Sequence, residues 1–204
     1  ADGKLLAALG AHGAPVNGVA LLPNSQAAIT AGADGLLKFW ALPLQPGRLL
    51  NPPHGGPVTA LALAADGARL VSASADKTLR VSTWAQGTQE RLLGGGAVQA
   101  LSLATQGNTL AAGMADNSVQ LWNLADGANL GSLFAHPGGV TGVAIPPSGQ
   151  QLVTTGADGQ LKLWSLPLKQ PRVLPHPDAL TAAVLSPTGQ RLYTAGADRI
   201  VRGW

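Results

Sequence analysis

The stretch LVTTGADGQLKLW, at residues 152–164, carries the pattern that decides the fold. Its aspartate recurs in five copies of the same phrase, at Asp34, Asp76, Asp116, Asp158 and Asp198. The intervals between these aspartates are 42, 40, 42 and 40 residues. A period near 40 residues is typical of a four-stranded propeller blade, which cannot bury both of its faces alone and must stack on neighbours. The sequence therefore predicts an array of five all-β units.

Three further residue types keep a fixed distance from these aspartates. A histidine precedes four of them by 22 residues, at His12, His54, His136 and His176. A tryptophan follows four of them by six residues, at Trp40, Trp122, Trp164 and Trp204. A hydroxyl residue precedes four of them by four residues, at Thr30, Ser72, Thr154 and Thr194. Three independent spacings that recur together are not a coincidence of composition.

On these residues the chain resembles the WD40 family, whose repeats begin near Gly-His and end near Trp-Asp. The resemblance covers essentially all 204 residues and implies a WD40-type β-propeller. It also implies one hydrogen-bonded tetrad per blade, running from Trp through Ser or Thr and His to Asp. On matching positions three units carry a complete tetrad: His12, Thr30, Asp34 and Trp40; His136, Thr154, Asp158 and Trp164; His176, Thr194, Asp198 and Trp204.

The tetrad also has a physical rationale that is independent of the family. A tryptophan N–H, a hydroxyl and an imidazole that are buried between sheets each cost free energy unless they are paired. A chain of hydrogen bonds satisfies all of them, and the turn carboxylate can also accept from nearby backbone N–H groups. We therefore expect the tetrads to stabilise the blades rather than to recognise a ligand.

The second unit departs from the pattern at one position. It keeps His54, Ser72 and Asp76, but Ser82 stands where the tryptophan belongs and Trp84 follows two residues later. Either the third strand of this unit is irregular, or Trp84 makes a different contact.

The third unit departs at two positions. Gly94 replaces the histidine and Ala112 replaces the hydroxyl residue, so that only Asp116 and Trp122 remain. We expect this blade to be held mainly by packing.

The two ends of the chain carry matching information. Residues 1–12 align with residues 125–136 without a gap, so the chain starts in an outer strand and ends in a unit that lacks one. We expect a single propeller domain over residues 1–204, in which the N-terminal strand completes the last of five four-stranded blades. The expected units span approximately residues 12–53, 54–93, 94–135, 136–175, and 176–204 plus 1–11. The alternatives are a fragment of a larger propeller and a ring assembled from several chains.

Few side chains remain for catalysis or metal binding. All four histidines stand at tetrad positions, five of the nine aspartates are turn residues, and Glu90 is the only glutamate. The chain has no cysteine, which excludes disulfides, a thiol nucleophile and a thiolate metal site. No glycine-rich phosphate loop follows a strand. We therefore expect neither enzymatic activity nor a cofactor nor a metal.

Charge and hydropathy narrow the classes of partner. The pI is near 9.7, yet the excess is only +3 and the basic residues are spread through all five units without aromatic clusters. Nucleic acid is therefore the weaker hypothesis, as is a small ligand in the central channel. No segment approaches the roughly 18 unbroken apolar residues of a membrane helix. We expect a soluble chain and favour the cytoplasm only slightly.

A protein or peptide partner is what the family resemblance implies. The residues before the turn aspartates, which face the top of such a ring, are all alanine, whereas binding hot spots are typically Trp, Tyr or Arg. We therefore expect partner contacts on the side and bottom, at Arg48, Arg91, Lys169 and Arg172. If the ring closes, the chain should be a monomer, and otherwise a homo-oligomer.

Overall fold

The computed structural model describes residues 8, 10–22, 26–42, 47–64, 67–94, 96–103, 108–146, 148–166, 172–186 and 188–204. These residues form nineteen strands in five antiparallel sheets, and the described ranges contain no helix. The expected all-β architecture is therefore confirmed. No helix in the described residues is long and apolar enough to cross a membrane.

Each sheet is a meander in which consecutive strands pair. The first contains β1 (Val16–Leu21), β2 (Ala27–Gly32), β3 (Leu37–Ala41) and β4 (Arg48–Leu49). The second contains β5 (Val58–Leu63), β6 (Arg69–Ser74), β7 (Leu79–Thr83) and β8 (Thr88–Leu93). The third contains β9 (Val98–Leu103), β10 (Thr109–Met114), β11 (Ser118–Asn123) and β12 (Asn129–Phe134). The fourth contains β13 (Val140–Ala144), β14 (Gln151–Gly156), β15 (Gln160–Ser165) and β16 (Arg172–Pro175), and the fifth contains β17 (Leu180–Leu185), β18 (Leu192–Gly196) and β19 (Val201–Gly203).

The hairpin between the second and third strands of each sheet turns on the residue after the repeated aspartate. That residue has a positive φ in all five sheets: Gly35 (77°), Lys77 (68°), Asn117 (72°), Gly159 (69°) and Arg199 (65°). Glycine adopts this conformation without steric penalty, whereas Lys and Arg adopt it at a cost. The turn geometry is therefore kept even where its preferred residue is absent.

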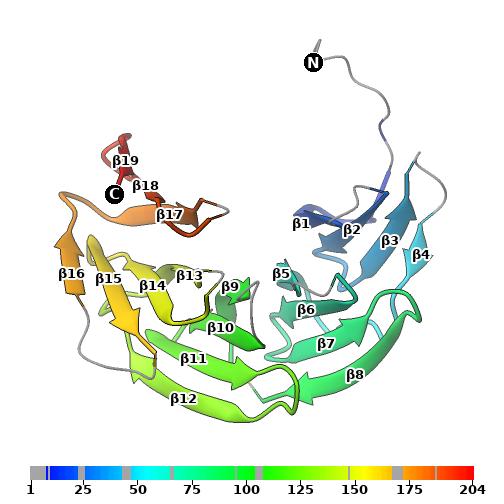
Figure 1. The fold of residues 1–204 in the computed structure, drawn as a ribbon. Coiled ribbons are helices and arrows are strands. Elements are labelled where there is room, and N and C mark those ends of the chain that lie inside the picture. The colour runs from blue at the N-terminus through cyan, green and yellow to red at the C-terminus, as the bar shows by residue number, and fades with distance from the viewer. Residues whose placement is uncertain are drawn as a thin grey trace.

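The five sheets stand side by side along an arc, with β1, β5, β9, β13 and β17 on its inner side (Figure 1). Neighbouring sheets contact each other through these inner strands, and an apolar cluster lies at each of the four junctions between sheets. The second strand is the most deeply buried strand of the first four sheets, because a sheet covers it on at least one side. The core is thus a series of inter-sheet layers rather than one central mass.

The arc is open between its first and fifth sheets, which stand at opposite ends (Figure 1). The fifth sheet has three strands among the described residues. The strand expected to complete it, within residues 1–11, falls largely outside the described residues, which here comprise only Ala8, Gly10 and Ala11, and none of these three is in a strand. Closure of the ring by this segment therefore stays a prediction.

Candidate interaction site

The first and fourth sheets carry the tetrad with the same geometry. In the fourth, Trp164 Nε1 lies 2.9 Å from Thr154 Oγ1, which lies 2.8 Å from His136 Nε2. His136 Nδ1 lies 2.9 and 3.1 Å from the two carboxylate oxygens of Asp158. In the first sheet the corresponding distances between Trp40, Thr30, His12 and Asp34 are 2.9, 2.8, 2.9 and 3.1 Å.

The chemistry of these groups fixes the direction of each hydrogen bond in the fourth sheet. The carboxylate of Asp158 can only accept, so His136 donates from Nδ1. The other ring nitrogen of this neutral imidazole then accepts from the Thr154 hydroxyl, whose oxygen accepts from the Trp164 N–H. Every polar group of the tetrad has a partner, although the His136 ring is fully buried.

Burial and hydrogen bonding shift the pKa values of the tetrad histidines and aspartates in opposite directions. Burial lowers the pKa of His136, and the attraction of Asp158 offsets this only in part. Burial raises the pKa of Asp76, but hydrogen bonds from the Thr78 hydroxyl and from the Gly55 and Thr78 backbone N–H groups outweigh it. The pKa of Asp76 therefore falls below its ordinary value, and this carboxylate stays charged near pH 7. The imidazole of His136 stays neutral there, because its pKa is also lowered.

The fifth sheet corrects the prediction of a third complete tetrad. Trp204 Nε1 donates to Thr194 Oγ1 at 3.0 Å, but Thr194 lies 3.5 Å from His176 Nε2, and Arg202 Nη1 reaches the same nitrogen at 3.2 Å. Arg202 also pairs with the Asp198 carboxylate at 2.6 Å. His176 Nδ1 is buried without a hydrogen-bond partner in the described residues. The Asp198 carboxylate thus pairs with the Arg202 guanidinium and not, as the sequence had predicted, with His176.

The two partial tetrads keep those links for which the residues exist. His54 lies 2.8 Å from Ser72 and 3.2 Å from Asp76. In the third sheet Asp116 accepts from Ser118, through its hydroxyl at 2.5 Å and its N–H at 3.0 Å.

Two glycines that the sequence pattern did not mark, Gly32 and Gly156, pack against the histidine and aspartate of their tetrads. A Cβ added at Gly156 would lie 2.4 Å from His136 Cγ and 2.5 Å from Asp158 Oδ1. At Gly32 it would lie 2.3 Å from Asp34 Oδ1 and 2.4 Å from His12 Nδ1. Both glycines stand two residues before the turn aspartate, so their recurrence was the available signal.

Trp84 makes a different contact from the tetrad tryptophans, which answers the open question about the second unit. Its ring stacks on Phe39 of the first sheet with centroids 5.0 Å apart and planes 7° apart. Its Nε1 donates to the Gly67 carbonyl at 2.6 Å. β7 pairs with β6 without a register shift, but its pairing with β8 shifts between Val81 and Ser82, so the third strand of this sheet is also irregular at the tryptophan position.

Two of the arginines predicted to contact a partner each donate a hydrogen bond to the next sheet, and their contact with a partner stays a prediction. Arg48 donates from Nη2 to the Trp84 carbonyl of the next sheet. Arg91 donates from Nη1 to the Leu124 carbonyl of the next sheet at 3.1 Å. The contact of Arg91 is partly buried, where a carbonyl needs a donor, whereas that of Arg48 is exposed. Lys169 lies outside the described residues.

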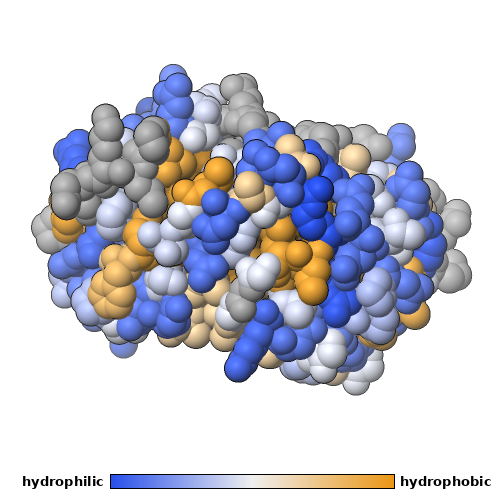
Figure 2. Space-filling view, turned by 90° about the horizontal axis from the view of Figure 1, so that it is seen from below, coloured by the Kyte–Doolittle hydropathy of each residue, from blue (hydrophilic) through white to orange (hydrophobic). Residues whose placement is uncertain are grey.

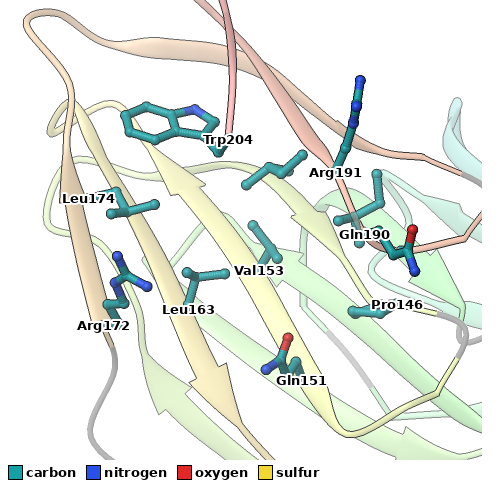
Figure 3. Close-up of a pocket in the computed structure, with 12 residues that line it drawn as sticks. Pro146, Gln151, Val153, Leu163, Arg172, Leu174, Gln190, Arg191 and Trp204 are labelled. Atoms are coloured by element: carbon teal, nitrogen blue, oxygen red, sulfur yellow. The ribbon is translucent and has the colours of Figure 1, made fainter.

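Arg172 differs from these two arginines, because it lines a cavity between the fourth and fifth sheets. The cavity has a volume of about 310 Å³. Leu163 and Leu174 form part of its apolar wall, the Trp204 ring lies across from them, and Arg172 stands at its edge (Figure 3). In the described residues neither Arg172 nor Arg191, which also lines the cavity, has a side-chain hydrogen bond or ion pair. This cavity is the candidate interaction site.

The outer strands also expose single apolar side chains, such as Leu92 on β8 and Phe134 on β12. Seen from below the arc, the outer rim is largely hydrophilic with separate apolar patches (Figure 2). Among the described residues no group of three or more His, Asp or Glu side chains could hold a metal ion.

Comparison with known protein families supports the repeat assignment. A model of the family described as "WD domain, G-beta repeat" matches the chain five times, at residues 3–41, 47–81, 87–123, 127–165 and 168–204. No curated protein matches the sequence significantly.

Proposed function

Because the chain belongs to the WD40-repeat family, we propose that it is a non-enzymatic interaction module that binds a protein partner in the cavity between its fourth and fifth sheets. The repeats themselves indicate a protein-interaction propeller module. The observation that carries the finer proposal is the cavity, which combines apolar walls with the guanidinium of Arg172, a group without a partner among the described residues. Concave apolar sites with a few polar groups at the edge are typical of ligand binding.

The use of the titratable groups supports a non-enzymatic role. His12, His54 and His136 each share a hydrogen bond with a turn aspartate and with a hydroxyl. Since both ring nitrogens are engaged, none of the three is free to move a proton at a surface site. Nδ1 of His176 has no hydrogen-bond partner among the described residues, but that nitrogen is buried.

Selection from a random peptide library displayed on phage tests the proposal. The folded chain is immobilised, and bound phage are compared with those recovered on Arg172→Ala. We expect enrichment of peptides that bind the parent chain saturably and bind the variant more weakly. A library that yields no saturable binder would contradict a role in peptide recognition, and binders indifferent to Arg172 would place the binding face elsewhere.

A second candidate, assembly of several copies into one ring, is favoured by a separate observation. The two end sheets expose apolar side chains, including Val19 (68%) and Leu21 (61%) on β1 and Val184 (61%) on β17 and Val201 (70%) on β19. At every internal junction the corresponding sheet faces cover each other.

A further inference from the structure

The turn aspartate of the third sheet differs from the other four, because no histidine or arginine pairs with it in the part of the chain that the structure describes. Three of the others lie within hydrogen-bond distance of their tetrad histidine, and Asp198 pairs with Arg202. The side chains of these four aspartates are only 11–17% exposed. Asp116, by contrast, is exposed. The third sheet lies in the middle of the arc, so this difference does not arise at either of its ends (Figure 1).

Two substitutions explain why Asp116 is left without such a partner. Gly94 stands where the other four units carry a histidine. Gln120 stands where the other four units carry a cationic side chain, at Lys38, Arg80, Lys162 and Arg202. The third unit therefore lacks both the imidazole and the cation that accompany the other turn aspartates.

The Asp116 carboxylate is held in place by its own turn. Its Oδ1 accepts from the Ser118 hydroxyl at 2.5 Å and from the Ser118 N–H at 3.0 Å. These hydrogen bonds hold the pKa of Asp116 below its ordinary value, so the carboxylate is charged near pH 7. Its Oδ2 has no hydrogen-bond partner among the described residues. A charged acceptor is thus available to a donor from outside the chain.

An exposed aromatic side chain lies on the same face of the sheet as this carboxylate. Ser118 on β11 stands opposite Phe134 on β12, and residues that stand opposite each other place their side chains on one face. Because the Ser118 hydroxyl donates to Asp116, the carboxylate lies over the face from which Phe134 projects. Phe134 is 63% exposed. The equivalent pair in the fourth sheet is Gln160 and Pro175, which offers no ring.

From this arrangement we propose that the Asp116–Phe134 surface binds an arginine side chain of a protein partner. The guanidinium donates to Oδ2 of Asp116, and its planar face stacks on the Phe134 ring. Arginine suits both contacts, because its planar guanidinium pairs with carboxylates and stacks on aromatic rings, whereas lysine is a compact point charge. The fifth sheet contains such an ion pair within the chain, between Arg202 and Asp198 at 2.6 Å.

This surface is separate from the cavity between the fourth and fifth sheets and goes beyond the function proposed for that cavity. Its test compares two peptides that differ in one charge. Acetyl-Gly-Arg-Gly-amide is titrated into the 204-residue chain labelled with ¹⁵N, and so is the same peptide with citrulline, the uncharged analogue of arginine. We expect the arginine peptide to shift the amide signals of Ser118 and Phe134 saturably at millimolar concentrations, because exposed ion pairs and single cation–π contacts are weak. The citrulline peptide should bind about threefold more weakly, or less well still.

Three protein variants make the test specific. Asp116→Asn removes the charge but keeps an oxygen that can accept from Ser118, and it should weaken binding of the arginine peptide about threefold or more. Phe134→Leu keeps an apolar side chain without the ring and should weaken binding about twofold or more. Asp126→Asn is the matched control, because Asp126 is also an exposed turn aspartate that accepts from the backbone N–H two residues later, at 2.8 Å. Binding should be unchanged in this control.

Saturable binding that weakens with citrulline, with Asp116→Asn and with Phe134→Leu, but not with Asp126→Asn, supports the proposal. It is overturned if the signals of Ser118 and Phe134 do not shift saturably, if the two peptides bind equally, if Asp116→Asn and Asp126→Asn have equal effects, or if Phe134→Leu binds as the parent does. The two peptides are compared on the parent chain, so this arm holds even if a variant fails to fold. Neither result bears on the cavity, which the phage selection with Arg172→Ala tests.

Discussion

At the residue scale, the spacing of the repeats determines which side chains meet. Which hydrogen bonds form also depends on whether another side chain pairs with the same carboxylate. The distances of 22, 18 and 10 residues bring His136, Thr154, Asp158 and Trp164 together as the sequence predicts. The same spacings fail to link His176 to Asp198, because Arg202 takes the carboxylate. Sequence could not predict this, since Arg80 stands at the equivalent position of the second sheet and leaves the hydrogen bond between His54 and Asp76 in place.

Removal of a tetrad carboxylate should destabilise the fold. In Asp158→Ala the fully buried His136 ring loses the acceptor of its Nδ1 proton. A buried donor left unpaired costs about 1–3 kcal/mol, so we expect a loss of that size in the free energy of unfolding, measured by urea denaturation. Asp116→Ala removes the same turn residue from a sheet without a tetrad histidine and should lose less. Equal losses in the two variants would contradict a stabilising role for the tetrad.

Stability should also depend on pH through the buried histidines. Burial lowers the pKa values of His54 and His136 below their ordinary value of 6.5. The unfolded chain then binds more protons than the folded chain near and below pH 6.5, so stability rises with pH across this range. The pKa values of Asp34, Asp76, Asp116 and Asp198 lie below their ordinary value, so these carboxylates do not change their charge between about pH 7.5 and 5. We expect the melting temperature to fall as the pH is lowered over that interval, and a constant or rising melting temperature would refute this assignment.

At the element scale, the sequence predicts the sheets better than the contacts between them. The aspartate turns and the repeat period indicate where the strands lie, because both can be seen in the order of residues along the chain. Contacts between sheets are harder to predict, as Arg48 and Arg91 illustrate. The carbonyls to which they donate lie on the next sheet, 36 and 33 residues away along the chain. A long charged side chain near a loop suggests a surface contact, and only the packing of two sheets reveals an internal one.

The stacked pair at the first junction provides a test at this scale. Trp84→Ala removes the ring that stacks on Phe39 and the hydrogen bond to Gly67. Large-to-small substitutions of packed aromatic residues cost about 3 kcal/mol or more, and we expect a loss of about 3 kcal/mol in the free energy of unfolding. Leu92→Ala, at a leucine that is 56% exposed, should change it by less than about 0.5 kcal/mol. A loss for Trp84→Ala no larger than that of Leu92→Ala would show that this contact does not stabilise the junction.

At the scale of the whole molecule, the repeat principle accounts for both the core and the ends. Each sheet offers two faces, and internal junctions cover four pairs of them. The remaining two faces stand at the ends of the arc (Figure 1). They expose valine and leucine side chains. The sequence alone could not show whether these faces end an open arc or meet in a closed ring. Because the two end faces correspond to the two sides of an internal junction, one copy can bind the next head to tail.

The solution mass of the 204-residue chain, determined by light scattering on a gel-filtration column, tests this account most directly. Assembly of several copies through the exposed end faces predicts a mass above the 20.5 kDa of one chain, whereas closure of the ring by residues 1–11 predicts a monomer. Val19→Lys and Val201→Lys, which place a charge on each end face, should return the mass to that of a monomer, whereas Leu92→Lys on an outer strand should not. A parent chain that elutes as a monomer at all concentrations would contradict the open arc and indicate that the chain covers its own end faces.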